Sequence, residues 1–273
     1  MSKQDFVLKK TTPQKFLKVL EIHLAEHCNL HCFSCSHFSQ LAKEAYYDLK
    51  EFEQDIKRLK VLTKGNIERF HLLGGEPLLN PDVLKYFALL RENFTHSHIW
   101  LITNGILLPK QDESFFQTCS KLNIELHPTK YPIEIDWQRV DELCKRYKVT
   151  LKFYNNAKIE KNSMKFVLNL EKQNDIYESF TRCFMSNFCV QLKEGKIYTC
   201  NICANIEHFN AKFKTTLMPS DEDCIDIYKA KNYEEILEFL AKPIPFCTYC
   251  DVKNWKSIGK WKRSEKSINE YLI

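Results

Sequence analysis

Three cysteines in one short stretch, Cys28, Cys32 and Cys35, constrain this chain more than any other feature. They directly follow an apolar run, so the C-x3-C-x2-C spacing places three thiols in one loop after a predicted strand. Thiolates at this spacing wrap three corners of a cubane iron–sulfur cluster, and such clusters normally take four thiolates. A cluster that is one ligand short leaves an iron open to a small molecule. The same loop also fits a zinc site completed by His27 or His31, or three buried structural thiols.

A second motif, Gly74-Gly75-Glu76-Pro77, ends another short apolar run about forty residues later. Consecutive glycines let backbone groups approach a ligand closely. The carboxylate of Glu76 beside them is suited to hold an ammonium group. Taken alone, these four residues also fit an ordinary turn.

Together the two motifs resemble the radical S-adenosylmethionine (SAM) superfamily. The resemblance implies that the three cysteines hold a [4Fe–4S] cluster whose open iron chelates SAM. It also implies that the Gly-Gly-Glu stretch binds the SAM amine and that reduction cleaves SAM to a 5′-deoxyadenosyl radical. The candidate cofactor-binding residues are Gly74, Gly75, Glu76, Pro77, Thr103 and Asn104. Ser34 departs from the family pattern, which usually has an aromatic residue there; Phe33 comes one place earlier.

Composition narrows the remaining classes. The 273 residues fit one large domain, or one domain with an appendage. The net charge of +5 is spread through interleaved basic and acidic residues, so we expect no nucleic-acid partner. The polar N-terminal stretch predicts neither a signal peptide nor a transmembrane helix, and hence no membrane partner. Twelve cysteines without a secretion signal predict a cytoplasmic location and metal ligation rather than disulfides.

Alternating strand and helix patterns predict the fold. The predicted strands are residues 18–25, 67–73, 98–103, 123–127, 149–154 and 164–169. The helices between them, such as 48–63, imply βα units and a parallel sheet. Six strands are too few to close an eight-stranded barrel. We therefore expect an α/β fold, with a partial (β/α)6 TIM-like barrel over residues 1–175 and ligands at the carboxyl ends of its strands.

Alternation along the strands predicts what lines the barrel. If the apolar face of each strand packs on the helices, polar side chains such as Glu21 and His23 face the lumen. Such a lining suits a hydroxyl-rich or charged substrate. The candidate catalytic residues, which would take a proton from the substrate, are His127, Tyr154 and Lys152. Each also fits a structural or SAM-binding role.

Cysteines gather again in residues 176–273, the predicted second subdomain. Glu194-Gly195 predicts a β-hairpin turn, a helix is expected near 232–241, and a terminal helix is expected over the barrel after Trp255. This layout resembles the twitch subdomain, the shortened relative of the SPASM domain, and enzymes of the inosamine dehydrogenase type. The resemblance implies one auxiliary [4Fe–4S] cluster, held by Cys183, Cys200, Cys247 and Cys250. Zinc at these thiolates is an alternative, and Cys189 or Cys203 could replace a named ligand.

The expected function is that of a radical SAM oxidoreductase of the dehydrogenase type. It would abstract hydrogen from a polar small molecule such as a sugar, a cyclitol or a nucleotide-linked sugar, with the auxiliary cluster as electron acceptor. An external one-electron reductant such as flavodoxin or ferredoxin would be its protein partner. The alternatives are an epimerase with Cys189 or Cys203 as hydrogen donor, a peptide-modifying enzyme, and a non-catalytic Fe–S or zinc scaffold.

Overall fold

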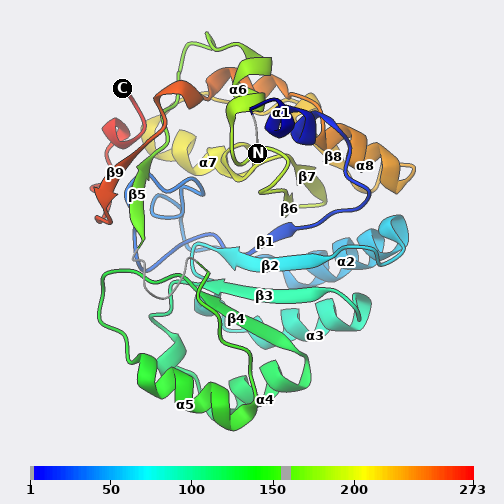
Figure 1. Ribbon diagram of the computed structural model, residues 1–273, viewed down its shortest axis with the longest axis vertical. Coiled ribbons are helices and arrows are strands. Elements are labelled where there is room, and N and C mark those ends of the chain that lie inside the picture. The colour runs from blue at the N-terminus through cyan, green and yellow to red at the C-terminus, as the bar shows by residue number, and fades with distance from the viewer. Residues whose placement is uncertain (1–2, 155–160) are drawn as a thin grey trace.

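A seven-stranded sheet forms the centre of the protein, seen in a computed structural model that describes residues 3–154 and 161–273 (Figure 1). Its spatial order is β4-β3-β2-β1-β6-β7-β8. Strands β1 to β4 pair in parallel, β6 pairs in parallel with β1, and β6, β7 and β8 pair antiparallel. The strands are β1 (Leu20–Ala25), β2 (Arg69–Gly74), β3 (His98–Thr103), β4 (Ile124–Pro128), β6 (Gln191–Lys193), β7 (Lys196–Tyr198) and β8 (Cys224–Asp226). The expected α/β fold with a parallel sheet is confirmed.

Helices follow the parallel strands as expected, with α4 and α5 at the β4 end of the sheet and α1, α6 and α7 at the β6 end (Figure 1). The helices are α1 (Lys3–Thr11), α2 (Leu49–Thr63), α3 (Val83–Asn93), α4 (Glu113–Lys121), α5 (Trp137–Tyr147), α6 (Ile176–Arg182), α7 (Asn201–Phe213) and α8 (Tyr233–Leu240). The predicted helix at 48–63 corresponds to α2, whose N-terminal amides are capped by the Asp48 carboxylate. No helix in the described part of the chain is both long and apolar enough to cross a membrane.

The two faces of the parallel strands divide as the alternation predicted. Leu20, Ile22 and Leu24 of β1 are fully buried in a core built with side chains of the flanking helices. Glu21 and His23, on the opposite face, are also buried, but among the polar side chains of the lumen. The apolar face therefore packs on the helices because it removes the most apolar surface from water, and the lumen stays polar.

Two of the six predicted strands differ from the sheet that forms. Residues 149–154 run beside β4 through three backbone hydrogen bonds but form only one bridge, Leu151 to Leu126. Residues 164–169 do not join the sheet; instead β5 (Asn162–Lys165) pairs with β9 (Lys256–Lys260) in a separate two-stranded sheet. The place beside β1 is taken by β6, from the hairpin that was assigned to the C-terminal subdomain. The sheet thus continues across the expected boundary at residue 175.

The predicted terminal helix after Trp255 is wrong. This segment forms β9 and a single 3-10 turn, η6 (Ile268–Glu270). Its side chains and backbone groups bond to the cysteine loop and to β5 as well as within the segment. Contacts with distant residues therefore override its local sequence pattern.

Candidate cofactor and substrate site

The first three cysteines lie in the loop that leaves the carboxyl end of β1. Burial, followed by the nearby Glu76 charge, raises the pKa of Cys28 to about 12. Burial and the charge of Cys32 raise the pKa of Cys35 to about 11. The three thiols are close enough that the charge of each of Cys32 and Cys35 disfavours a thiolate at Cys28. Three partly buried thiols in one loop fit a cationic iron centre, because a bound metal cation holds coordinating thiols as thiolates.

The two glycines of the second motif are required by how closely β2 approaches this loop. A Cβ on Gly74 would lie 2.1 Å from the carbonyl oxygen of Ala25, and one on Gly75 would lie 2.0 Å from that of His27. The amide of Gly75 donates to the Ala25 carbonyl at 2.8 Å, and that of Glu76 donates to the His27 carbonyl at 3.0 Å. The glycines therefore dock the Glu76 turn directly against Cys28.

The carboxylate of Glu76 is the hydrogen-bond acceptor around which this turn is organised. Its carboxylate is fully buried and accepts hydrogen bonds from the Thr103 hydroxyl at 2.6 Å, the Asn104 amide at 2.8 Å and the Leu78 amide at 3.2 Å. Burial raises its pKa to about 7 despite these bonds. All three partners are neutral, so the lone pairs that remain are suited to a cationic ligand group such as an ammonium.

Thr103 and Asn104 meet Glu76 at the carboxyl end of β3. The side-chain amide of Asn104 also donates to the side-chain Oδ1 of Asn29 at 2.7 Å and points toward the Cys28 sulfur, 3.7 Å away. The ends of β1, β2 and β3 thus bring five of the predicted cofactor residues beside the cysteine loop; Pro77 opens the following turn, η1 (Pro77–Leu79). This is the edge at which parallel α/β folds bind ligands.

The C-terminal segment closes over the same loop, which sequence reasoning missed. The Trp261 indole N–H donates to the Cys32 sulfur at 3.2 Å, and the Tyr131 hydroxyl also bonds to that sulfur. The Tyr271 hydroxyl donates to the Cys35 carbonyl at 2.9 Å. Trp261 lies 229 residues from Cys32, so no local pattern signals these contacts.

Ser34, the departure from the family pattern, is held by the same segment. Its backbone is left-handed, with φ of 47°, and its amide donates to the Glu270 carboxylate at 3.0 Å. Its hydroxyl accepts from the Phe166 amide at 2.9 Å, and the residue is fully buried. A small hydroxyl residue therefore fits where distant backbone packs against the loop.

The four cysteines predicted for the auxiliary site also converge. Burial raises the pKa of Cys250, Cys200 and Cys247, and the charges of neighbouring thiols add to each shift. These charge effects link every pair among Cys183, Cys200, Cys247 and Cys250. Two backbone amides, those of Met185 and Ser186, donate to the Cys183 sulfur at 3.3 Å.

The alternative ligands lie at the edge of this group. Burial raises the pKa of both Cys189 and Cys203. The charges of Cys183 and Cys200 add to the shift at Cys189, and those of Cys200, Cys247 and Cys250 add to the shift at Cys203. Neither pKa is affected in this way by all four of Cys183, Cys200, Cys247 and Cys250. Cys183, Cys200, Cys247 and Cys250 therefore remain the predicted ligands of the auxiliary cluster.

A buried lysine lies beside this second group of thiols. Lys10 of α1 is fully buried, and its ammonium donates to the Cys183 carbonyl and the Ser186 hydroxyl. Its ammonium also lies 5.2 Å from the centre of the Phe180 ring. Burial lowers the pKa of Lys10, while the charges of Cys183, Cys247, Cys200 and Cys189 oppose that shift. The N-terminal helix thus places a lysine amine beside the second group of thiols.

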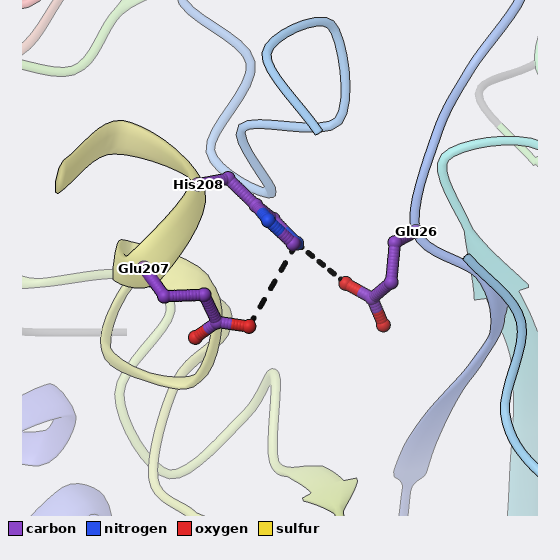
Figure 2. A group of neighbouring side chains, drawn as sticks. All are labelled: Glu26, Glu207 and His208. Atoms are coloured by element: carbon purple, nitrogen blue, oxygen red, sulfur yellow. Dashed lines mark hydrogen bonds and ion pairs between the residues drawn. The ribbon is translucent and has the colours of Figure 1, made fainter. Parts of the chain in front are cut away.

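A compact cluster of possible ligand atoms elsewhere in the protein is explained by ion pairs rather than by a metal site. Among the described residues, the group with three ligand atoms within 4.8 Å is Glu26, Glu207 and His208 (Figure 2). The Lys193 ammonium lies 3.3 Å from the Glu26 carboxylate and also pairs with Glu207. A lysine therefore already supplies the positive charge. The same distance test applies to zinc at the cysteines. Four sulfurs around one zinc ion would be about 3.8 Å apart, but neither cysteine group of the described residues has three sulfurs within 4.8 Å of one another.

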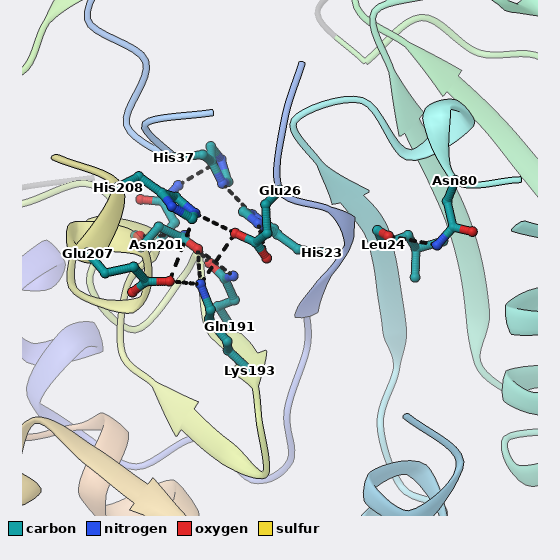
Figure 3. A network of polar contacts seen from close by, with 11 residues as sticks. His23, Leu24, Glu26, His37, Asn80, Gln191, Lys193, Asn201, Glu207 and His208 are labelled. Atoms are coloured by element: carbon teal, nitrogen blue, oxygen red, sulfur yellow. Dashed lines mark hydrogen bonds and ion pairs between the residues drawn. The ribbon is translucent and has the colours of Figure 1, made fainter. Parts of the chain in front are cut away.

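The same carboxylate begins a polar network that joins the two cysteine sites (Figure 3). Glu26 accepts from His208 at 2.7 Å and lies 3.5 Å from His23, which bonds to His37 at 2.8 Å. His37 in turn contacts the Asn201 amide at 3.0 Å. Burial would raise the pKa of Glu26, but His23 and His208 hold it well below its usual range. The network locks β6 and α7 against the end of β1.

A cavity of about 910 Å³ opens on the lumen face of the sheet. Its walls include Glu21, His71, Trp100 and Tyr154, together with Cys189. The segment 12–16, which leads from α1 toward β1, covers one side. Its size is typical of small-molecule sites.

The three candidate catalytic residues lie at different distances from this cavity. Tyr154 lines it, but burial and the Glu21 charge raise its pKa to about 12. His127 is buried behind Trp100, with ring centres 3.7 Å apart, and burial lowers its pKa. The Lys152 side chain is 67% exposed and lies 3.8 Å from Glu125, outside the lining. The sequence did not identify His71 or Trp100, although both obey the strand alternation.

Comparisons with known proteins agree with this geometry. Residues 22–152 match the family model of the Radical SAM superfamily. The chain is 27% identical over 117 residues to GTP 3′,8-cyclase of Campylobacter lari, covering 42% of this chain and 36% of that relative. It is 28% identical over 152 residues to the probable GTP 3′,8-cyclase of Pyrococcus horikoshii, covering 54% and 47%. The match thus spans between about a third and a half of these two relatives' length.

A solved structure resembles most of the chain. The crystal structure of BtrN in complex with AdoMet and 2-DOIA matches with a TM-score of 0.50 and 15% identity, over 87% of this chain and 94% of that one. At this identity the likeness concerns the fold. It supports a partial TIM-like barrel.

Proposed function

The chain carries a radical SAM domain over residues 22–152, and on that premise we propose that it reductively cleaves SAM and oxidises a polar small molecule. The observation that carries the proposal is the convergence of Cys28, Cys32 and Cys35 with the buried carboxylate of Glu76. A radical SAM domain implies a [4Fe–4S] cluster and SAM. Three thiols suit the cluster, and a buried carboxylate with neutral partners suits the amine of SAM.

When bound, the cluster and SAM supply a 5′-deoxyadenosyl radical, which takes a hydrogen atom from a substrate carbon. The residues of the chain position the cofactor and enclose the cysteine loop. Glu76 would hold the amine end of the cofactor, and Thr103 and Asn104 orient the Glu76 carboxylate by donating hydrogen bonds to it. The C-terminal segment covers the cysteine loop and keeps water from it.

Oxidation requires that the substrate lose a proton and one further electron. A [4Fe–4S] cluster at Cys183, Cys200, Cys247 and Cys250 would supply the one-electron acceptor. His127, Tyr154 and Lys152 remain the candidates for the proton. Of these, Tyr154 lines the cavity, whereas His127 lies behind the Trp100 ring. A flavodoxin or ferredoxin is the proposed external reductant.

Cys189 supports a second candidate function, an epimerase. Its side chain lines the cavity and is not part of the fully linked group of four thiols. A thiol there is placed to return a hydrogen atom to a substrate radical. Dehydrogenation lowers the product mass by two hydrogens, whereas epimerisation in D2O keeps the skeleton and adds one solvent deuteron.

Iron content and SAM cleavage test the proposal. Anaerobically reconstituted protein is expected to hold about eight irons per chain. Replacing Cys28, Cys32 and Cys35 with alanine should remove about half of the iron and all production of 5′-deoxyadenosine. Cys119→Ala, a buried thiol of the helical core, is the matched control and should keep both. Cleavage of SAM by the triple variant, or wild-type protein that binds only zinc, would refute the proposal.

A further inference from the structure

The cavity on the lumen face holds polar atoms that the protein itself does not satisfy. Glu21 and His71 are each 5% exposed and stand opposite each other on β1 and β2. Among the residues that the structure describes, none bonds to one carboxylate oxygen of Glu21, to either ring nitrogen of His71 or to the Nε of Arg69, and all four atoms are buried. The nearest approach of the pair, Glu21 Oε1 to His71 Nδ1, is 3.7 Å, which is beyond hydrogen-bond distance.

Buried polar atoms without partners are rare because each costs free energy. Here they occur together on adjacent strands, and the residues that carry them line the same cavity. A ligand in the cavity would satisfy them. The unpaired atoms therefore indicate a binding site rather than isolated packing faults.

The chemistry of these atoms suits hydroxyl groups. A carboxylate only accepts, an arginine Nε only donates, and a neutral imidazole does one of each. A hydroxyl both donates and accepts, so neighbouring hydroxyls on one ring match this mixture. The His71 and Trp100 rings stack at 5.2 Å with an angle of 13°, and both line the cavity.

The lining as a whole is basic. It contains four basic side chains, Lys9, Lys15, Lys18 and Arg69, against the two carboxylates of Asp5 and Glu21. All three lysines are exposed and lie in α1 or in the segment between α1 and β1. An anionic group at the mouth would be attracted there, and phosphate is the common anion of small metabolites with hydroxylated rings.

We propose that this cavity binds a hydroxylated ring that carries a phosphate group, a sugar phosphate or cyclitol phosphate. Glu21 and His71 hold the ring hydroxyls, and Lys15 and Lys18 hold the phosphate. This assignment rests on the proposed function, since it names the substrate class of that reaction. It also places the ring between the lumen face of the sheet and Cys189.

Calorimetric titration of the anaerobically reconstituted protein, with SAM present, tests the assignment. The probes are glucose 6-phosphate and myo-inositol 1-phosphate, each compared with glucose and myo-inositol. We expect at least one phosphate to bind, and about tenfold or more tightly than its parent. Glu21→Gln, which preserves shape, should weaken that binding about 10- to 100-fold. Lys15→Gln with Lys18→Gln should abolish the preference for the phosphate.

Matched controls separate local from general effects. Glu53→Gln and Lys57→Gln change an exposed ion pair on α2 and should leave binding unchanged. His71→Ala is a second variant of the wall, and the iron content and visible absorption of every variant report on its folding. Binding of neither phosphate, equal binding of parent and phosphate, or full affinity in Glu21→Gln would overturn the assignment. SAM cleavage by wild-type protein without any sugar tests the proposed function independently.

Discussion

Replacing Gly75 with alanine would force the end of β2 away from the cysteine loop. The new Cβ would lie 2.0 Å from the His27 carbonyl oxygen, 2.2 Å from the His27 carbonyl carbon and 2.8 Å from the Cys28 amide nitrogen. All three are backbone atoms, so no side chain is able to rotate away. To reach the 3.0 Å that Cβ contacts respect, the two segments must separate by at least about 1 Å.

The cost of this separation follows from the bonds that it breaks. The Gly75 amide to the Ala25 carbonyl and the Glu76 amide to the His27 carbonyl, 2.8 and 3.0 Å long, would lengthen beyond hydrogen-bond distance. Each is worth about 1 kcal/mol, and overpacking adds about 1 to 3 kcal/mol. We expect the free energy of unfolding to fall by about 3 to 5 kcal/mol. The melting temperature should fall by about 10 °C.

Thermal unfolding followed by circular dichroism, with iron quantified on the same samples, measures both consequences. Because Cys28 moves with His27, the variant should also lose about half of its iron after reconstitution. Gly259→Ala is the matched control. Apart from its chain neighbours, no atom of the described residues lies within 4 Å of its added Cβ, and its φ of +88° is unfavourable, a cost of about 1 to 2 kcal/mol. If Gly75→Ala were as stable as Gly259→Ala and held full iron, the close approach would not matter and this reasoning would fail.

Three further perturbations test other parts of the structure. Trp261→Phe removes an N–H···S bond that stabilises the reduced form of the first cluster. The reduction potential of that cluster should therefore fall by about 40 mV in an EPR-monitored titration. Trp255→Phe, in which the lost indole bonds to a backbone carbonyl instead, should leave the potential unchanged. Cys250→Ala should lose about four irons per chain whereas Cys189→Ala keeps them, and equal losses would contradict the assigned ligands. Burial lowers the pKa of His127, so the unfolded chain gains a proton as the pH falls through the ordinary histidine range while the folded chain does not. Stability in urea should therefore decrease between about pH 7.5 and 5.5, and decrease less in His127→Gln.

The sequence alone determined the features that are local. The spacing of Cys28, Cys32 and Cys35, the Gly-Gly-Glu turn and the alternation along β1 and β4 each depend on residues a few positions apart. Backbone geometry converts such spacing directly into shared loops and faces. The sequence also predicted that ligand groups gather at the carboxyl ends of the strands, where Thr103 ends β3 and Asn104 follows it.

Tertiary structure decided what depends on distant partners. The terminal segment became an extended strand and a turn because its bonding partners, such as Ser34 and Cys32, lie more than two hundred residues away. The hairpin near Gly195 joined the main sheet because β1 offered it an unpaired edge. No short sequence pattern predicts this edge pairing or the unsatisfied atoms of Glu21 and His71. Both arise only when strands that are distant in sequence are brought into register.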